Sequence, residues 1–333
     1  MEVPTIVKAE ILWTRKCPLK CSYCGMVSSK ERAPSFLMCR GVPRLKERGC
    51  RFAAIYGASP FYDFEGLPEF VRALCEADIL STVIVDGISA SLSKTRFLKL
   101  YDVGLRSLTV SYDGGIAGIP SVDAKSRSGL ALARWALEKF DDLRDVELIS
   151  TVTRRNISRL MEVIPMLVDE GFWYSFDLIH PDRHQPGSKC RGASSELVFE
   201  REDAGSLSRF AEMLLELRGV GGRIHQSVAF LEFLRDQPLT AMELKWNCTR
   251  CDEFPGWVTI DCDGTVRPCD DFCDPNESLK VWELTEETYL AWIARTKAFV
   301  LSYCPGCLWS THWDALAIKR GDISLDGYVH IRK

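Results

Sequence analysis

The sequence predicts an α/β fold: a partial (β/α)6 barrel, followed by a small cysteine-rich domain with a β-hairpin. Two observations predict it. Strand-like segments alternate with helical segments from residue 9 to residue 179, and seven cysteines gather between residues 248 and 307. Alternating strands and helices imply a parallel sheet with right-handed crossovers. Six units do not close the eight-stranded barrel, so we expect an open one.

Each unit follows from the residue pattern. The expected strands are short and rich in β-branched and aromatic residues, and the expected helices carry apolar residues at helical spacing. We expect strands at 9–13, 51–56, 81–85, 107–112, 146–152 and 173–179. We expect helices at 36–48, 67–77, 91–101, 126–140 and 157–170, and two bridging helices at 202–218 and 228–235. The hairpin strands are expected at 257–260 and 265–267, with Asp263 and Gly264 in the turn.

Composition narrows the function classes. The chain has 333 residues, a formal net charge of -4 and 46% hydrophobic residues, which is typical of a soluble globular protein and unlike a nucleic-acid binder. It has no apolar run of about 18 residues and no visible secretion signal, so we expect a cytoplasmic protein without a membrane or nucleic-acid partner. In that compartment, 14 cysteines indicate metal binding or redox work rather than disulfides.

Three cysteines lie close together directly after the first expected strand. Cys17, Cys21 and Cys24 have the spacing CxxxCxxC. Three thiolates on a short loop can bind three irons of a 4Fe–4S cluster and leave the fourth iron open, as a catalytic site requires. A structural zinc site is the alternative. It would need a fourth ligand nearby, and no histidine precedes His180.

The segment CPLKCSYC at residues 17–24 resembles the motif of radical S-adenosylmethionine (SAM) enzymes, including the aromatic Tyr23 before the third cysteine. The resemblance covers about residues 9–179. It implies that the open iron binds the amino and carboxylate groups of SAM. An electron from the cluster then cleaves SAM, and the 5′-deoxyadenosyl radical abstracts a hydrogen atom from the substrate. An external flavodoxin or ferredoxin would supply the electron.

The resemblance also implies where SAM binds. The family carries a Gly-Gly-Glu-Pro motif after its second strand, which holds the SAM amino group. Here the second glycine and the glutamate are replaced, but backbone carbonyls and the Ser59 hydroxyl can still accept hydrogen bonds from an ammonium group. The residues implied in SAM binding are Gly57, Ala58, Ser59 and Pro60, Ser111 and Asp113 at the end of the fourth strand, and Thr153 and Asn156 after the fifth.

The late cysteines resemble those of SPASM/Twitch auxiliary-cluster domains. Cys251, Gly264 and Cys269 have the family's spacing. Together with Cys304 and Cys307 they would supply four thiolates to one auxiliary 4Fe–4S cluster, and a zinc-ribbon site is the alternative. The chain has no cysteine after Cys307, which favours the shorter Twitch form. We expect residues 1–180 to form the barrel, 181–239 the bridging helices and an active-site loop, and 240–333 the auxiliary domain.

Five further residues are candidates for the substrate side of the chemistry. Cys248, Cys262 and Cys273 are surplus: they could replace an assigned ligand, hold a second auxiliary cluster, or act as a free thiol that returns a hydrogen atom to the substrate. His180 and Arg183 lie in or beside a polar loop at 181–193, after the sixth strand. They could bind substrate or move a proton, and a solvated surface loop is the alternative.

The sequence determines the identity of the substrate less than it determines the fold or the cluster chemistry. Only 16 residues precede Cys17, so we expect no leader-peptide-binding domain there and favour a small molecule such as a sugar or aminocyclitol, oxidised or epimerised. The alternative is a maturase that modifies a ribosomal peptide. A more distant alternative is a non-catalytic iron–sulfur or zinc-binding protein.

Overall fold

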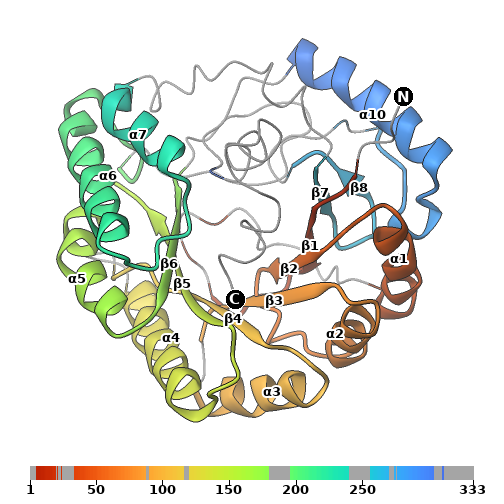
Figure 1. The fold of residues 1–333 in the computed structure, drawn as a ribbon, viewed down its shortest axis with the longest axis horizontal. Helices are drawn as coiled ribbons and strands as arrows, with labels where there is room; N and C mark the ends of the chain where they lie inside the picture. Colours follow the sequence, from red (N-terminus) through yellow and green to blue (C-terminus); the bar gives the residue numbers. More distant parts are fainter. Residues whose placement is uncertain are drawn as a thin grey trace.

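A computed structural model provides the structure of the chain. It describes residues 5–19, 21, 24, 34–87, 90–115, 120–179, 196–239, 256–269, 274, 276–303 and 310. Within these ranges the strands form one curved sheet that lines the inside of an incomplete ring, and the helices lie along its outside (Figure 1).

The sheet has eight strands in the order β6-β5-β4-β3-β2-β1-β7-β8. Neighbours from β1 to β6 pair in parallel, as the alternation of strands and helices predicted. The strands are β1 (Lys8–Thr14), β2 (Phe52–Gly57), β3 (Leu80–Val85), β4 (Ser107–Ser111), β5 (Asp145–Val152), β6 (Trp173–Leu178), β7 (Trp257–Ile260) and β8 (Val266–Arg267).

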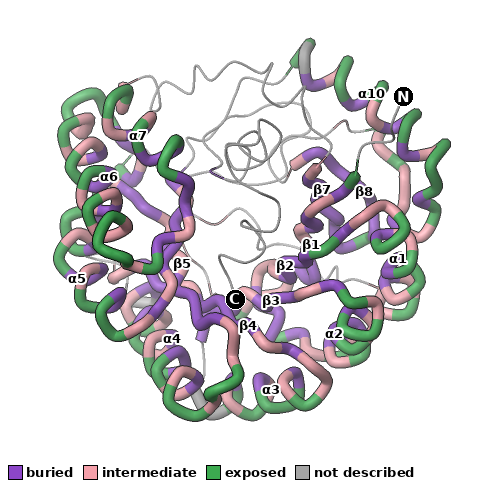
Figure 2. Tube along the Cα trace, in the orientation of Figure 1, coloured by how far each residue is buried: buried purple, intermediate pink, exposed green. Residues whose placement is uncertain are grey.

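The helices cover the outer face of this sheet, and the strands beneath them are largely buried (Figure 2). The α-helices are α1 (Ser35–Glu47), α2 (Leu67–Glu76), α3 (Ala90–Asp102), α4 (Pro120–Lys139), α5 (Ile157–Asp169), α6 (Ala204–Gly219), α7 (Val228–Asp236) and α10 (Glu286–Tyr303). Two short 3-10 helices are η1 (Arg201–Asp203) and η2 (Val281–Glu283). The expected strands and helices are confirmed, with ends that differ by one or two residues except at the start of α4.

Helix α4 begins at Pro120, whereas the pattern predicted a start at residue 126. Proline suits the first turn of a helix, because its missing N–H group would have no partner there. The early start matters for the site because it places Lys125 on α4, where it pairs with Asp113 beyond the carboxyl end of β4.

Strand β1 separates two environments. Ile11 and Trp13 belong to the apolar core, where Trp13 stacks on Phe70 of α2 with ring centroids 5.5 Å apart. Leu12 lies in a separate small cluster, packed with Cys262. Alternate side chains of a strand point to opposite faces, so β1 contributes to the helix-covered core and to the inner face of the sheet.

The inner face of the sheet is polar below its carboxyl ends. The Thr82 and Thr109 hydroxyls lie 3.0 Å apart, and Thr109 donates a hydrogen bond of 2.8 Å to Glu147. The other carboxylate oxygen of Glu147 lies 3.2 Å from Nδ1 of His225. Closed eight-stranded barrels fill this space mainly with branched apolar side chains. The open sheet instead carries a buried hydrogen-bonded chain across three strands.

The predicted hairpin exists, and it extends the sheet. β7 pairs with β1 in parallel, with Ile11 opposite Ile260, and β8 pairs antiparallel with β7. The sequence predicted the hairpin but did not predict that it pairs with β1. Pairing covers the edge of β1, which would otherwise expose unpaired backbone groups. It also places Trp257–Ile260, within the cysteine-rich region, beside the strand that leads into Cys17. The division of the chain at residues 180 and 239 stays a prediction.

No helix among the described residues is both long and apolar enough to cross a membrane.

Gly264 permits the hairpin turn for two reasons. Its φ is +83°, and a Cβ atom there would lie 2.2 Å from the Trp282 ring. We expect Gly264→Ala to lower the free energy of unfolding by about 2–4 kcal/mol, from left-handed strain and overpacking together. Urea unfolding followed by circular dichroism measures this.

Gly221→Ala is the matched control, because Gly221 has φ of +90° but nothing within 4 Å of a Cβ atom. It should cost only about 1–2 kcal/mol, from the backbone strain alone. Equal losses in the two variants would show that the Trp282 contact does not restrict Gly264.

Candidate active site

A cavity of about 190 Å³ lies at the carboxyl ends of the parallel strands. This is many times the roughly 10–15 Å³ that one water needs by the same measure, so the cavity has room for a small ligand. Open α/β sheets place their ligand sites at this edge. The lining residues are Cys17, Leu19, Cys21, Cys24, Tyr56, Gly57, Ala58, Ile84, Val85, Asp86, Ser111, Lys125, Ile149, Ser150, Thr151, Asp177 and Ile179.

The three motif cysteines all line this cavity. The backbone N–H of Leu19 donates a hydrogen bond of 3.3 Å to Sγ of Cys17, and the N–H of Cys24 donates one of 3.1 Å to the Cys21 carbonyl. Burial raises the pKa of the Cys17 thiol to about 12. A thiol ligand must lose its proton to bind a metal, so iron would displace that proton.

The donor set fits an iron–sulfur cluster better than a single metal ion. Within the described ranges, no three cysteine, histidine or carboxylate side chains are grouped closely enough to hold one ion. In a cluster each thiolate binds a different iron, so its ligands stand further apart than those of one ion. Three thiols that share a cavity without converging on one point suit a cluster with an open iron.

Gly57 allows the chain after β2 to run close to β1. Its φ is +150°, and a Cβ atom there would lie 2.5 Å from the Thr14 carbonyl oxygen. The N–H of Ala58 donates a hydrogen bond of 2.9 Å to the same carbonyl. Gly57 and Ala58 line the cavity, whereas Ser59 and Pro60 are buried and are not lining residues. The Ser59 carbonyl accepts from the N–H groups of Tyr62 and Asp63 in the turn that follows.

Lys125 is a cation that lines the cavity and that the sequence analysis missed. Its ammonium lies 3.0 Å from Oδ2 of Asp113, which is fully buried, and the Thr151 N–H donates a hydrogen bond of 2.9 Å to Oδ1. Burial alone would lower the pKa of Lys125, but Asp113, Cys21 and Asp86 together raise it above its usual value. The ammonium therefore stays charged. The sequence pattern predicted a helix only from residue 126 onward. It therefore gave no indication that Lys125 lies at the site.

Asp113 is thus behind the cavity wall, where it holds Lys125, while Ser111 lines the cavity itself.

Asn156 and Thr153 support the site from behind. Oδ1 of Asn156 accepts hydrogen bonds from the N–H and hydroxyl of Thr153, at 2.7 and 3.0 Å. Its Nδ2 donates to the carbonyls of Asp113 and Thr151, both at 2.9 Å. These four bonds use the full capacity of an amide side chain. Asn156 therefore ties the end of β4 to the end of β5, and neither it nor Thr153 lines the cavity.

Asp86 is the second cavity residue that the sequence analysis missed. It follows the carboxyl end of β3, is 8% exposed and lines the cavity. Its negative charge contributes to the raised pKa values of Cys17 and Lys125, so it lies within electrostatic reach of both. With Asp177, the cavity lining therefore contains two carboxylates and one ammonium group beside the cysteines.

The β7–β8 hairpin also packs against residues that line this cavity. Cys262 in its turn is 2% exposed, and it packs with Leu12 against Cys24, Tyr56 and Ala58. It is not among the residues that line the cavity. Burial, followed by repulsion from Asp261, raises the pKa of the Cys262 thiol to about 12, which keeps it protonated.

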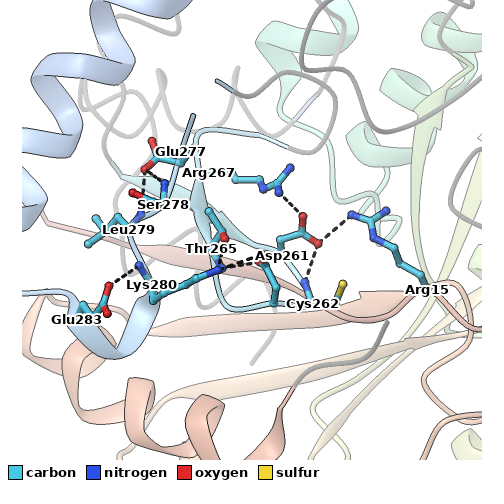
Figure 3. Close-up of polar contacts among 11 residues, drawn as sticks. Arg15, Asp261, Cys262, Thr265, Arg267, Glu277, Ser278, Leu279, Lys280 and Glu283 are labelled. Carbon is cyan, nitrogen blue, oxygen red and sulfur yellow. Dashed lines mark hydrogen bonds and ion pairs between the residues drawn. The ribbon is translucent and has the colours of Figure 1, made fainter. Parts of the chain in front are cut away.

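Three buried charged residues anchor this hairpin turn (Figure 3). Asp261 pairs with Arg15 at 2.8 Å and with Arg267 at 2.5 Å, and it accepts a hydrogen bond of 2.7 Å from the Cys262 N–H. Burial alone would raise the pKa of Asp261, but the two guanidinium groups and the hydrogen bond hold it below its usual value. Asp261 is therefore ionised.

Of the remaining candidates, the structure describes Cys269. Cys269 is half-buried, two residues after β8, and is the one proposed auxiliary ligand within the described ranges. The candidate site residues that lie outside the described ranges are Tyr23, His180, Arg183, Cys248, Cys251, Cys273, Cys304 and Cys307.

Comparison with known proteins gives one curated relative. No family model matches the chain. The chain is similar to a PqqA peptide cyclase of Bradyrhizobium diazoefficiens, with 26% identity over 179 residues. The alignment covers 50% of this chain and 44% of the relative, so the chain spans less than half of that protein's length.

Solved structures share the fold over most of the chain. SuiB of Streptococcus suis bound to S-adenosylmethionine has a TM-score of 0.65 and 13% identity, covering 92% of this chain and 74% of its own. SuiB bound to the precursor peptide SuiA scores 0.62 with 13% identity, covering 92% and 73%. The protein anSMEcpe, with bound AdoMet and Cp18Cys peptide, scores 0.58 with 14% identity, covering 90% and 84%. The parallel sheet, the cysteine loop after β1 and these likenesses agree that the chain has the radical SAM fold.

Proposed function

We propose that the chain is a radical SAM enzyme, with a cluster held by Cys17, Cys21 and Cys24 and SAM bound in the cavity beside them. One observation carries this proposal: three thiols, two carboxylates (Asp86 and Asp177) and the ammonium group of Lys125 line one cavity at the carboxyl ends of the strands. When bound, the cluster supplies the electron that cleaves SAM to the radical that abstracts a hydrogen atom from the substrate. The protein's own residues position and shield these groups.

The charged residues suit the two ends of the methionine part of SAM, which carries an ammonium and a carboxylate group. Lys125, held by Asp113, would bind the carboxylate. Asp86 would accept hydrogen bonds from the ammonium group, in place of the glutamate that Ser59 replaces. Gly57 and Ala58 leave their backbone open to the ligand on the same wall. Asn156 and Thr153 are positioning residues in this proposal, because they fix the ends of β4 and β5.

The substrate that best fits the comparisons is a peptide. SuiB is known with a precursor peptide, anSMEcpe with a bound peptide, and the curated relative is a peptide cyclase. These proteins favour the alternative of a ribosomal peptide over the small molecule that the sequence favoured. An auxiliary cluster at Cys251, Cys269, Cys304 and Cys307, and an external flavodoxin or ferredoxin as electron donor, remain part of the proposal.

Removal of any motif cysteine should abolish SAM cleavage. We expect Cys17→Ala, Cys21→Ala or Cys24→Ala to lose about four irons per chain after anaerobic reconstitution, out of roughly eight. Iron analysis and chromatography of 5′-deoxyadenosine measure both effects. The exposed Cys75 on α2 provides the control, since Cys75→Ala should keep its iron and activity. Full activity in the motif variants would contradict the proposal.

Loss of the Lys125 or the Asp86 charge should weaken SAM binding. A charge-assisted hydrogen bond contributes about 1.5–3 kcal/mol, so Lys125→Met or Asp86→Asn should raise the Kd for SAM roughly 10- to 100-fold. Calorimetry on the reconstituted protein measures this. Lys99→Met, on the exposed side of α3, is the matched control and should bind SAM normally. Unchanged affinity in both cavity variants would place SAM elsewhere.

A peptide substrate should stimulate SAM cleavage. Synthetic peptides from short reading frames beside the gene are the test set, and sugars and aminocyclitols are the comparison set. We expect one peptide to increase 5′-deoxyadenosine formation and to change in mass, because an ordered substrate accepts the radical. Stimulation by an aminocyclitol, with no response to any peptide, would restore the small-molecule hypothesis.

A further inference from the structure

Asp63 is a buried acidic residue that the proposed function does not use. It follows the cavity wall at Gly57 and Ala58 by a few residues, and it is 7% exposed. Its Oδ2 accepts a hydrogen bond of 3.0 Å from the Thr14 hydroxyl at the end of β1, and it lies 3.3 Å from the Lys16 ammonium. The Asp63 side chain therefore binds the segment that leads from β1 into the cysteine loop.

Thr14 connects this contact to the backbone just before Cys17. The Thr14 hydroxyl is fully buried, donates to Asp63, and accepts a hydrogen bond of 3.1 Å from the Lys16 N–H. A hydroxyl has one donor and two acceptor sites, so it can make both bonds at once. Asp63 thus fixes the direction of the Thr14 hydroxyl, and that hydroxyl fixes the backbone of Lys16.

The turn at residues 59–63 is itself held by its surroundings. The Asp63 carbonyl accepts a hydrogen bond of 2.9 Å from the indole N–H of Trp13, which is buried in the core and stacks on Phe70. The Ser59 carbonyl accepts one of 3.2 Å from the Asp63 N–H. Because the core holds this turn, the turn provides a fixed support for the cysteine loop.

The same segment continues from one wall of the cavity. Gly57 and Ala58 line the cavity, and the Ala58 N–H donates a hydrogen bond of 2.9 Å to the Thr14 carbonyl. The segment after β2 therefore holds Thr14 twice, through its carbonyl and through its hydroxyl. Together these bonds set the place of the cysteine loop relative to the cavity wall.

Stability alone does not account for an acidic residue at this place. β1 and β2 already pair in parallel, from Lys8 opposite Phe52 to Thr14 opposite Gly57. Burying a carboxylate also costs free energy, because the charge loses its hydration. The position of Asp63 at the base of the cysteine loop therefore favours a role at the site.

The place of the cysteine loop matters because SAM would contact two parts of the cavity at once. In the proposed function, SAM lies between the cluster on the loop and the polar groups on the wall. A preorganised site binds its ligand more tightly, since no rearrangement opposes binding. A loop that moves relative to the wall would bind SAM less tightly and orient it less well.

We propose that Asp63 is a positioning residue, which acts through Thr14 and Lys16 to fix the cysteine loop relative to the SAM-binding wall at Gly57 and Ala58. This inference rests on the proposed function. The cluster itself needs only the three thiols. Loss of Asp63 or of the Thr14 hydroxyl should therefore weaken SAM binding without removing the cluster.

Hydrogen exchange in the chain without cluster or SAM tests the positioning directly. Asp63→Ala and Thr14→Val each remove one side of the Asp63–Thr14 bond. We expect faster amide exchange at residues 14–19 in both variants, measured by mass spectrometry, because the loop base opens more often. Thr14→Ser keeps the hydroxyl and should restore slow exchange. Asp102→Ala, at the exposed end of α3, is the control and should change nothing there.

SAM binding by the reconstituted full chain gives the second measurement. We expect Asp63→Ala and Thr14→Val to keep their iron, to raise the Kd for SAM roughly 10-fold or more, and to show a smaller change in the electron paramagnetic resonance signal when SAM is added. The double variant should raise the Kd no further than Asp63→Ala alone, because the two side chains act as one unit.

The outcomes separate this inference from the proposed function. If Asp63→Ala does not fold, Thr14→Val decides the outcome alone. Unchanged SAM affinity in the loaded variants, additive losses in the double variant, or loss of iron from both single variants would each overturn the inference only. An unaltered chain that binds no cluster, or whose cluster does not respond to SAM, would overturn the proposed function itself.

Discussion

The parallel alignment of β1 to β6 is the constraint on which the rest of the structure depends. In a parallel sheet the carboxyl ends of all strands meet at one edge, so loops that are distant in sequence share one space. Cys17 follows β1, Gly57 ends β2, Asp86 follows β3 and Thr151 lies near the end of β5, and all four line one cavity. An antiparallel order would have sent half of them to the opposite edge.

Buried polar residues behind this shared edge hold the polar groups of the ligand site in place. Asp113 does not line the cavity itself, yet it keeps Lys125 charged and directed by a 3.0 Å ion pair. Asn156 in turn ties the Asp113 carbonyl to Thr151 and Thr153 at the end of β5 through four hydrogen bonds. A ligand therefore meets a preorganised wall. Such a wall needs little rearrangement on binding, and this favours a tightly oriented cofactor.

The hairpin connects two parts of the chain that are more than 240 residues apart in sequence. Pairing of β7 with β1 fixes its backbone, and the Arg15–Asp261 pair at 2.8 Å links its turn to the residue that leads into the cysteine loop. Cys262, one of the late cysteines in the sequence, forms a small buried cluster with Leu12 against which Cys24 packs. The described part of the cysteine-rich region therefore packs against the proposed SAM site at this point.

The sequence by itself determined the order of elements, the open parallel sheet, the hairpin and the cysteine loop, because these follow from local periodicity, turn residues and short spacings. Gly57, Ala58 and Ser111, which the family resemblance implied in SAM binding, line the cavity. Only the tertiary structure showed Asp86 and Lys125 in the cavity, Asp113 and Asn156 behind it, and Ser59 turned into a buried loop. It also decided that β7 pairs with β1 and that Asp261 lies between two arginines. These features depend on contacts between residues far apart in the chain, and no local pattern encodes which distant partner a buried charge or a strand edge will find.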